Sequence, residues 1–328
     1  GSVYGTGGYN SGDPSVAIGT NGYFYNGFIN SGSGQSCAYS TDQGQTWTSV
    51  TIATKPSGFS SLLDKNHLTI DNSTNSPYEG NLYSGWTAFG GSSDNEIEVA
   101  RSTDGGQSWQ QKIMVSGAVN AGNHNQGVNL QTGPEGEVYA VWAIYDNWPG
   151  DENALGFARS LDGGASFQPA QRIIQNIKGI RNTTAGKNHR VNSFPSMAVD
   201  ISNSSYSGDI YVVWPNVGVP GTNQGPDIYV YMIKSTDGGN TWSTPIKVNQ
   251  DPMNTGKKHY FPWITCDPVT GTLSVIFYDD RNVSNNQVET WVANSLDGGQ
   301  TWDDFRVSDV AFTPTPIGTL FIRLEEEQ

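Results

Sequence analysis

Short stretches of alternating hydrophobic and polar residues recur along the chain, and most of them end in an aromatic residue. They cover residues 23–28, 82–86, 138–142, 210–214 and 273–277. Further short runs precede four of them, at residues 15–19, 67–71, 197–200 and 263–267. Alternation with a period of two predicts β-strands, and no segment keeps the 3.6-residue period of a helix. The pattern therefore predicts an all-β protein.

One eight-residue pattern, Ser-x-Asp-x-Gly-x-(Thr/Ser)-aromatic, occurs five times, once after each set of strands. Its aspartates are Asp42, Asp104, Asp162, Asp237 and Asp297, at spacings of 58 to 75 residues. A period of about 60 residues is the length of one four-stranded β-propeller blade with generous loops. Around the fourth copy we expect strands near residues 195–200, 208–214, 226–235 and 242–249. The pattern then marks the turn between the third and the outermost strand.

The chemistry of this repeated segment is structural. An Asp carboxylate accepts backbone N–H groups across a tight turn, the Gly permits φ > 0, and the aromatic ring packs between sheets. Five copies at near-regular spacing indicate a repeated building unit. We therefore assign none of the five aspartates a catalytic role.

The repeated segments resemble the Asp-box, or bacterial neuraminidase, repeats of sialidases and related propellers, over roughly residues 13–310. The resemblance implies one β-propeller domain over residues 1–328, made of four-stranded antiparallel blades. We expect blades at about residues 13–53, 60–116, 124–175, 190–249 and 258–308, with a closing segment at 309–328. Sialidases have six blades, so we expect a short or shared sixth blade from strands near residues 317–324 and 3–5. The alternatives are a five-bladed ring and a truncated chain.

Charge and composition narrow the partners. The chain of 328 residues has 31 Asp and Glu against 17 Lys and Arg, a formal net charge of −14. That charge repels a phosphate backbone and argues against nucleic acid as a partner. No apolar run approaches the roughly 20 residues that span a bilayer. With the resemblance, this predicts a secreted or cell-surface monomer, in which Cys37 and Cys266 are free thiols.

Histidines and basic residues gather on the predicted face opposite the repeated turns, where loops leading into the innermost strands converge. All four histidines fall in these loops: His67, His124, His189 and His259. Nine of the 17 Lys and Arg lie on the same face: Lys55, Lys65, Lys178, Arg181, Lys187, Arg190, Lys257, Lys258 and Arg281. This concentration favours an anionic glycan or other carbohydrate, with Arg recognising a carboxylate. The alternative is that long loops simply collect polar residues.

The resemblance to sialidases also implies roles for single residues. A sialidase uses a Tyr nucleophile activated by a Glu, an Asp as acid and base, and three arginines that hold the sugar carboxylate. The candidate catalytic residues are Tyr260 as nucleophile, Asp64 as acid, Asp280 and His259. The candidate substrate-binding residues are Arg181, Arg190, Arg281, His67, His124 and His189. Other acidic and phenolic side chains on this face are Asp146, Asp151, Glu152, Asp279, Tyr145 and Tyr278. The family's early aromatic-Arg-Ile-Pro segment is missing, since no arginine precedes Arg101.

Three functions remain open at this point. The first is hydrolysis of a terminal acidic sugar, as in an exo-sialidase. The second is a non-catalytic propeller that binds glycan or protein. The third is a lyase on a uronate polysaccharide, in which His and Tyr move the protons.

No cofactor is expected. The histidines lie at different offsets from their strands and form no His-x-x-x-His pair, which argues against a shared metal site. Structural calcium in the Asp- and Asn-rich loops stays an alternative, although no EF-hand spacing occurs.

Overall fold

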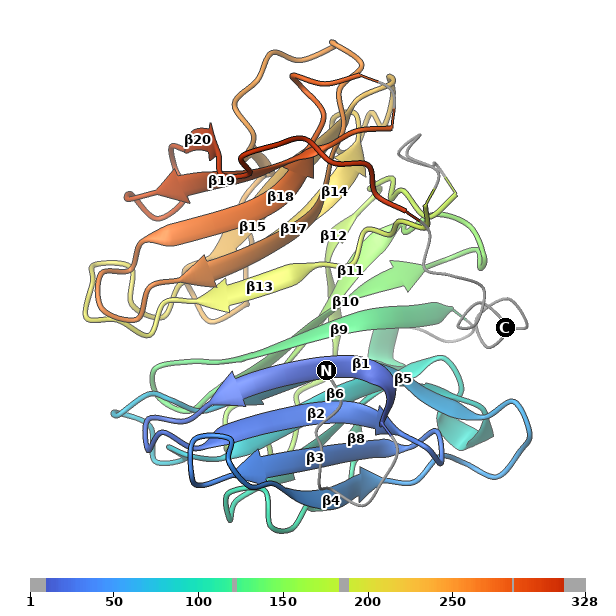
Figure 1. The fold of residues 1–328 in the computed structure, drawn as a ribbon, viewed down its shortest axis with the longest axis vertical. Coiled ribbons are helices and arrows are strands. Elements are labelled where there is room, and N and C mark those ends of the chain that lie inside the picture. The colour runs from blue at the N-terminus through green and yellow to red at the C-terminus, as the bar shows by residue number, and fades with distance from the viewer. Residues whose placement is uncertain (1–9, 120–122, 183–188, 285, 316–328) are drawn as a thin grey trace. The chain divides into compact units, whose positions relative to one another are not determined.

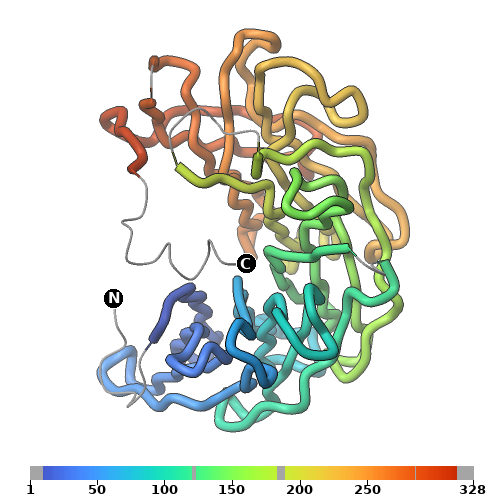
Figure 2. Tube along the Cα trace, turned by 90° about the vertical axis from the view of Figure 1, so that its right-hand side faces the viewer, coloured from blue at the N-terminus to red at the C-terminus, as the bar shows by residue number. Residues whose placement is uncertain are grey.

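The computed structural model describes residues 10–119, 123–182, 189–284 and 286–315. The chain divides into two compact units. Unit 1 contains Gly1–Ile144 and Leu155–Ile173, and unit 2 contains Tyr145–Ala154 and Ile174–Gln328. Figure 2 traces the chain through the successive strand sets in the order of the sequence.

The described residues form five four-stranded sheets, each with the sequential strand order of a propeller blade (Figure 1). Blade 1 contains β1 (Asn10–Ile18), β2 (Phe24–Asn30), β3 (Gln35–Ser40) and β4 (Thr48–Ala53). Blade 2 contains β5 (Leu62–Ile70), β6 (Leu82–Phe89), β7 (Glu96–Ser102) and β8 (Ile113–Met114). Blade 3 contains β9 (His124–Thr132), β10 (Val138–Tyr145), β11 (Ala154–Ser160) and β12 (Gln171–Gln175).

The last two blades belong to unit 2. Blade 4 contains β13 (Ser196–Val199), β14 (Ile210–Val217), β15 (Ile228–Ser235) and β16 (Ile246–Lys247). Blade 5 contains β17 (His259–Cys266), β18 (Leu273–Asp279), β19 (Glu289–Ser295) and β20 (Asp303–Arg306). Within the described ranges, the helical segments are two 3-10 turns, at Gly91–Ser93 and Gly117–Val119. The predicted all-β fold of four-stranded antiparallel blades is confirmed.

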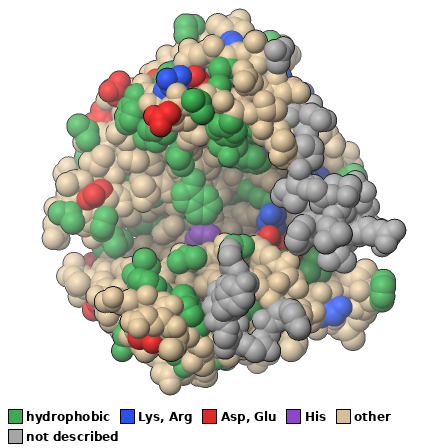
Figure 3. Space-filling model, viewed as in Figure 1, with side chains coloured by type: hydrophobic (Ala, Val, Ile, Leu, Met, Phe, Trp, Pro, Cys, Tyr) green, Lys and Arg blue, Asp and Glu red, His purple; other side chains and the backbone are tan. Residues whose placement is uncertain are grey.

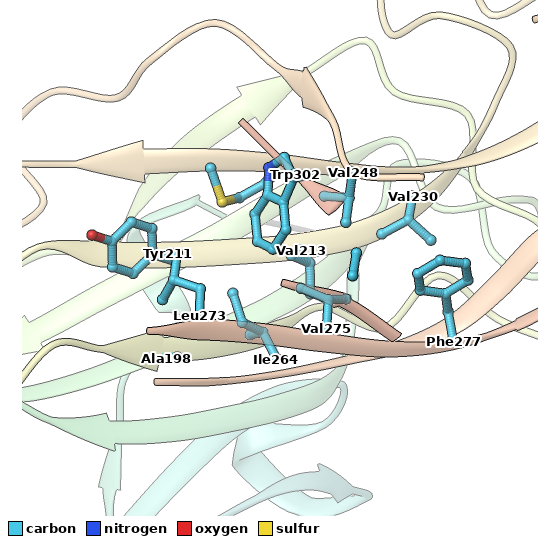
Figure 4. Close-up of a cluster of buried hydrophobic side chains, with 12 residues drawn as sticks. Ala198, Tyr211, Val213, Val230, Val248, Ile264, Leu273, Val275, Phe277 and Trp302 are labelled. Carbon is cyan, nitrogen blue, oxygen red and sulfur yellow. The ribbon is translucent and has the colours of Figure 1, made fainter. Parts of the chain in front are cut away.

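In unit 2, blades 4 and 5 pack face to face through a shared core (Figure 4). Blade 4 contributes Tyr211 and Val213 from β14, and blade 5 contributes Val275 and Phe277 from β18. Alternate residues of a strand share a face, so every second residue of each strand points into this core. Strand β14 is buried at every position, which accounts for its nearly continuous apolar sequence.

Each Asp-box turn is held by the same hydrogen bonds. In the first box, the Ser40 hydroxyl donates to Asp42 Oδ1 at 2.7 Å and accepts the Gly44 N–H at 2.8 Å. The Asp42 carboxylate also accepts the N–H and the hydroxyl of Thr46. These hydrogen bonds, led by that of the Thr46 hydroxyl, lower the pKa of Asp42 to about 2. The same four contacts recur in the other boxes, which confirms the structural role of the repeat.

Neighbouring blades within each unit are joined at their innermost strands. A main-chain N–H of the later blade donates to a side chain of the earlier one. The pairs are Leu68 to Ser15 Oγ at 2.8 Å, Leu130 to His67 Nδ1 at 3.1 Å, and Ile264 to Ser196 Oγ at 3.2 Å. Because the free edge of a strand exposes unpaired N–H groups, each link satisfies a donor and fixes the spacing of two blades.

The Asp-box turns form a second set of links to the preceding blade. Arg101 on β7 donates to the carbonyl oxygen of Gly163 at 2.8 Å, and Lys234 on β15 donates to that of Gly298 at 3.1 Å. Both glycines have positive φ, 62° and 67°. A Cβ at Gly163 would lie 2.5 Å from the Tyr78 ring, so this turn needs glycine for its backbone and for its contact.

The sixth blade stays a prediction, because the segments near residues 3–5 and 317–324 lie outside the described residues. Blade 5 nevertheless carries apolar residues on both faces. Opposite its packed face, Trp263, Ile276, Val292 and Phe305 are cross-strand neighbours. Trp263 is 51% exposed and Phe305 is 45% exposed. Apolar residues on both faces are typical of a sheet that is covered on both sides.

Replacing Gly163 by Ala is expected to destabilise the protein more than replacing Gly105, its counterpart in the second Asp box. Both have positive φ, 62° and 70°, so both alanines bring backbone strain. The Gly163 Cβ would also meet Tyr78 at 2.5 Å, whereas the nearest atom to a Gly105 Cβ is the Tyr25 hydroxyl at 3.7 Å. We expect an additional loss of about 1–3 kcal/mol in the free energy of unfolding, measured in urea. Equal losses in the two variants would contradict a role for the Tyr78 contact.

Candidate functional site

Glu152, in the 146–153 loop between β10 and β11, is a buried carboxylate that holds together the loops of unit 2. Its Oε1 accepts the Tyr145 hydroxyl at 2.8 Å and the Ser193 N–H at 2.9 Å. Its Oε2 accepts the N–H groups of Ile180 at 3.1 Å and Arg181 at 3.4 Å. Glu152 is 0% exposed, and burial raises its pKa. One side chain thus fixes segments up to about 40 residues away in the sequence.

Arg181 and Arg190 lie on the two segments that Glu152 holds. The Arg181 guanidinium lies over the Trp148 ring, with Cζ 4.1 Å from the ring centroid. Trp148 contacts Tyr145 edge-on at 5.0 Å. Burial and the Glu152 charge raise the pKa of Tyr145, and the charges of Arg181 and Arg190 act in the opposite direction. Arg190 is exposed. We call Trp148, Arg181 and Arg190 the arginine surface.

The chain carries 17 Lys and Arg against 31 Asp and Glu. The face drawn in Figure 3 consists mostly of uncharged polar and hydrophobic side chains. The charges of Arg181 and Arg190 both act on Tyr145, on a chain with a net charge of −14. A guanidinium pairs with anionic groups.

An aromatic group surrounds Tyr260 near the start of β17. Its ring centroid lies 5.6 Å from that of His189, 5.2 Å from that of Phe261 and 5.7 Å from that of Tyr278. Strand β17 has a bulge between Tyr260 and Trp263, where Phe261 adopts φ 54°. A β-bulge redirects the side chains around it. Here it leaves Phe261 37% exposed while Tyr260 is 0% exposed.

The predicted nucleophile, Tyr260, is therefore a buried phenol. Burial, followed by the charge of Asp280, raises its pKa. Its hydroxyl has no hydrogen-bond partner among the described residues. A neutral phenol donates a proton more readily than it attacks, so these contacts do not support the nucleophile role, which stays a prediction. The Tyr–Glu pair of unit 2 is instead Tyr145–Glu152, and both of its members are buried.

His259 lies in a buried ion network at the start of β17. Its Nδ1 is 2.7 Å from the Ile228 carbonyl oxygen. Its Nε2 is 3.2 Å from Asp251 Oδ1 and 3.3 Å from Asp279 Oδ2. Since oxygens face both ring nitrogens, the ring carries two N–H groups and a positive charge. Burial opposes that charge, but the hydrogen bonds to Asp251 and Asp279 raise the pKa of His259 to about 9.

Arg281 belongs to the same network. Its Nε donates to Asp279 Oδ2 at 2.7 Å, and its two terminal nitrogens donate to the Asp304 carboxylate at 3.2 and 2.6 Å. The guanidinium also stacks on Trp291, with Cζ 3.9 Å from the ring centroid. Two carboxylates of the protein thus engage Arg281. Its place in a substrate-binding triad with Arg181 and Arg190 stays a prediction.

Asp280 is engaged by the loop that precedes β17. Its carboxylate accepts the Lys258 N–H at 2.7 Å, and its carbonyl oxygen accepts Lys257 Nζ at 2.8 Å. Asp280 is 7% exposed. These contacts connect two neighbouring loops of blade 5. The catalytic role of Asp280 stays a prediction.

In unit 1, Gln126 connects two of the predicted residues, Asp64 and His124. Gln126 Nε2 donates to Asp64 Oδ2 at 3.2 Å, and Gln126 Oε1 lies 3.4 Å from His124 Nε2. His67 takes a different position, because its Nδ1 accepts the Leu130 N–H between blades. Desolvation lowers the pKa of His67 to about 4, so its ring is neutral at neutral pH.

Sequence reasoning did not select the side chains that organise the arginine surface. Tyr145 and Glu152 were recognised only as available groups, and Trp148 was not considered. The available signal was a loop rich in aromatic and acidic residues, Tyr145 to Glu152, between two strongly apolar strands. Such loops are common on propellers, so the signal does not distinguish a buried organising carboxylate from an exposed one.

Within the described ranges, no group of three or more His, Cys, Asp or Glu side chains could hold a metal ion. No helix of that part of the chain is long and apolar enough to cross a membrane. Cys37 and Cys266 are free thiols, as predicted.

Comparison with known proteins agrees with the repeat and the fold. The family model for the BNR/Asp-box repeat matches residues 38–49, which include the first box. Among curated protein sequences, none matches the chain. An intramolecular trans-sialidase from Ruminococcus gnavus, solved with oseltamivir carboxylate, is similar in structure, with a TM-score of 0.51 at 13% identity. That likeness covers 92% of this chain and 87% of the trans-sialidase chain. The chain is an Asp-box propeller with the sialidase-like fold.

Two further solved structures share this fold. A protein of unknown function from Dyadobacter fermentans aligns with a TM-score of 0.59 at 15% identity, over 91% of this propeller and 83% of its own chain. An ulvan lyase of a new polysaccharide lyase family, bound to -[GlcA(1-4)Rha3S]-, aligns with a TM-score of 0.55 at 13% identity. That alignment covers 91% of the propeller and 73% of the lyase. Identities this low establish the fold alone.

Replacing Glu152 by Gln is expected to loosen both segments of the propeller that carry the arginines. Each carboxylate oxygen of Glu152 accepts two hydrogen bonds, and the amide nitrogen of Gln accepts none. The two donors that face this nitrogen therefore lose their acceptor. We expect a loss of roughly 2–4 kcal/mol in the free energy of unfolding and faster hydrogen exchange at Ile180 or Ser193. The exposed Glu135→Gln is the matched control and should change neither quantity. Unchanged exchange in Glu152→Gln would refute the organising role.

The stability of the propeller is expected to fall as pH rises through the range in which His259 loses its proton. The pKa of His259 is raised to about 9 in the fold, against 6.5 as its ordinary value. Its stabilising contribution is therefore complete below about pH 6.5 and lost as pH rises through about 9. Urea unfolding from pH 6 to 10 measures this decline, which should be shallower in His259→Gln. His67→Gln should keep the wild-type slope above about pH 7.5, where His67 is neutral in both the folded and the unfolded state. Identical slopes in the wild type and His259→Gln would rule out a charged His259.

Proposed function

We propose that this Asp-box propeller acts on glycans that carry an acidic sugar, and that it hydrolyses a terminal acidic residue in the manner of an exo-sialidase. The arginine surface is the observation that carries the proposal. A guanidinium binds a carboxylate through two parallel hydrogen bonds, and an aromatic ring beside it offers an apolar face to a sugar ring. Arg181 lies 4.1 Å from Trp148 in this arrangement. Action on extracellular glycans agrees with the predicted secreted or surface location.

The rigidity of the arginine surface supports binding. Glu152 accepts hydrogen bonds from Arg181 and from Ser193, three residues beyond Arg190, and is itself fully buried. Segments fixed in advance lose less conformational entropy when a ligand binds. A buried carboxylate that anchors two arginine-bearing segments is therefore well suited to hold a charged ligand in one orientation.

The chemistry of the proposed hydrolysis follows the roles predicted for the sialidase pattern. Within unit 2, Arg181 and Arg190 hold the sugar carboxylate and Tyr260 acts as nucleophile. The role of Asp64 as acid is a separate expectation, because Asp64 belongs to unit 1. A tyrosine nucleophile avoids bringing a second negative charge to an acidic substrate. Because burial raises the pKa of Tyr260, this route requires the phenol to become accessible and to lose its proton when substrate binds.

A uronate lyase is the second candidate, and one observation favours it. The His189 and Tyr260 rings have centroids 5.6 Å apart, beside the exposed Phe261. In a lyase, a base removes the proton next to the uronate carboxylate and an acid protonates the leaving oxygen. A tyrosine with a raised pKa suits the acid, and the arginines would neutralise the carboxylate. This reaction leaves an unsaturated sugar and needs no nucleophile.

Arg190→Ala should weaken the binding of sialyllactose at least tenfold, because a charge-assisted hydrogen bond contributes roughly 1.5–3 kcal/mol. Isothermal titration calorimetry measures this effect. Arg172→Ala, on the outer strand β12, makes the same change of charge and should bind as the wild type does. Equal affinities of the two variants would count against the arginine surface.

Turnover distinguishes the candidate functions. A fluorogenic sialoside reports hydrolysis, and ultraviolet absorbance of the unsaturated product reports cleavage of a uronate polysaccharide. Release of the fluorophore, lost in Arg190→Ala, supports the sialidase-type reaction. Absorbance without fluorophore release favours the lyase, and binding without either signal indicates a glycan-binding module.

A further inference from the structure

Four polar side chains of unit 1 form a continuous chain on strands β5 and β9 and the turn before β7. Asp64 Oδ2 lies 3.2 Å from Gln126 Nε2, and Gln126 Oε1 lies 3.4 Å from His124 Nε2. His124 Nδ1 lies 2.8 Å from Asn95 Oδ1. His124 is 3% exposed and Gln126 is 8% exposed, whereas Asp64 is half-buried. This series of side-chain contacts thus connects a partly exposed carboxylate to a buried imidazole.

The backbone fixes both ends of this chain. His124 and Gln126 are two residues apart on β9, so their side chains share one face. Strand β5 has a bulge between Asp64 and His67, with Lys65 at φ 51°, and a bulge redirects the side chains beside it. Asn95 is anchored by its N–H, which donates to the Ala88 carbonyl oxygen at 2.8 Å.

A primary amide has one donating end and one accepting end, so the two groups on either side of Gln126 cannot both accept or both donate. With the NH2 group turned to Asp64, the Gln126 oxygen faces the ring. Asn95 places a second oxygen at the other ring nitrogen. Both oxygens are satisfied when His124 carries two N–H groups. The orientation that stabilises an ionised Asp64 is therefore the one that stabilises a charged His124.

We propose that Gln126 is a positioning residue that couples the protonation of His124 to the charge on Asp64. When His124 loses its Nε2 proton, that nitrogen becomes an acceptor and attracts the amide NH2 group. The amide rotates, and its oxygen then faces Asp64, which takes up a proton and donates its O–H to that oxygen. One proton has left His124 and one has been bound by Asp64. Gln126 neither gains nor loses a proton.

Further charged and polar groups lie beside each member of the pair. Lys65, which follows Asp64 in the sequence, has its Nζ 3.8 Å from Asp13 Oδ2. Thr87 is the cross-strand partner of Asp64. On the other side, the Phe89 ring lies 5.6 Å from the His124 ring.

Glu96 completes these surroundings. Its carboxylate accepts a hydrogen bond from Nδ2 of Asn125, the residue after His124, at 3.3 Å. These groups set the local field, and Gln126 alone among the described side chains is hydrogen-bonded to both Asp64 and His124 in the contacts given above.

The consequence for catalysis rests on the proposed function, in which Asp64 is the acid. The coupling would keep Asp64 ionised while His124 is charged, so protonation of Asp64 as a general acid would require a neutral His124. The coupling itself does not depend on any substrate. It can therefore be tested on the free protein.

NMR titration of the His124 ring and the Asp64 carboxyl group is the test. In the wild type, each resonance should show two steps, because coupled groups share their protonation events. Gln126→Met keeps the length of the side chain and removes both ends of the amide. We expect the pKa of Asp64 to rise and that of His124 to fall, each by roughly one unit, and the second steps to disappear. The exposed Gln107→Met is the matched control and should titrate as the wild type does.

A second variant guards against misfolding of Gln126→Met. Asp64→Asn removes the carboxylate from the half-buried end, and the pKa of His124 should again fall by roughly one unit. Identical His124 titrations in the wild type, Gln126→Met and Asp64→Asn would overturn the proposal. Coupled titration without cleavage of any acidic glycan would refute the proposed function and leave the coupling standing, whereas cleavage with independent titrations would do the reverse.

Discussion

The hydrogen bonds of the Asp-box turn are the interaction on which the rest of each unit depends. The Ser hydroxyl and Asp carboxylate, as in Ser40 and Asp42, satisfy the donors of the turn internally. In boxes two to five a glycine follows the Asp, and in the third box its carbonyl oxygen accepts a hydrogen bond from Arg101 of the preceding blade. One turn therefore ends a blade and also attaches it to its neighbour. Each such bond contributes only about 0.5–1.5 kcal/mol net, so stability comes from repetition.

The opposite ends of the strands carry no repeated motif, and each loop must satisfy its polar groups in its own way. Glu152 shows one solution, in which four donors converge on a single buried carboxylate. Burying a charge is costly unless hydrogen bonds replace its hydration, and this site supplies them from main-chain N–H groups and the Tyr145 hydroxyl. The arrangement that satisfies Glu152 also fixes the segments of Arg181 and Arg190. Structural and functional demands on this loop coincide.

The repeat and the strands could be predicted because they follow from local rules. Alternation and turn chemistry act within about ten residues, and the five boxes are legible one by one. The partners of Arg281 could not be predicted in this way. Asp304 lies 23 residues farther along the chain, and only the pairing of β18 with β19 and of β19 with β20 brings the two together. The same holds for Glu152 and Ser193, which are 41 residues apart. The sequence identifies the basic residues of the loops and offers Glu152 and Asp279 as available groups, but it does not show which basic residue each carboxylate contacts.

Environment, rather than residue type, determines the chemistry of the histidines and arginines in these loops. His67 accepts a main-chain N–H and is kept neutral by desolvation, whereas His259 lies between two carboxylates and is kept charged. The arginines differ in the same sense. The fork of Arg281 donates to Asp279 and Asp304, which uses the in-plane N–H groups that a sugar carboxylate would need. The Arg181 guanidinium lies over the Trp148 ring, with Cζ 4.1 Å from the ring centroid. Arg281 shows that a ring contact and anion binding are compatible, because it lies over Trp291 while its N–H groups donate to Asp279 and Asp304.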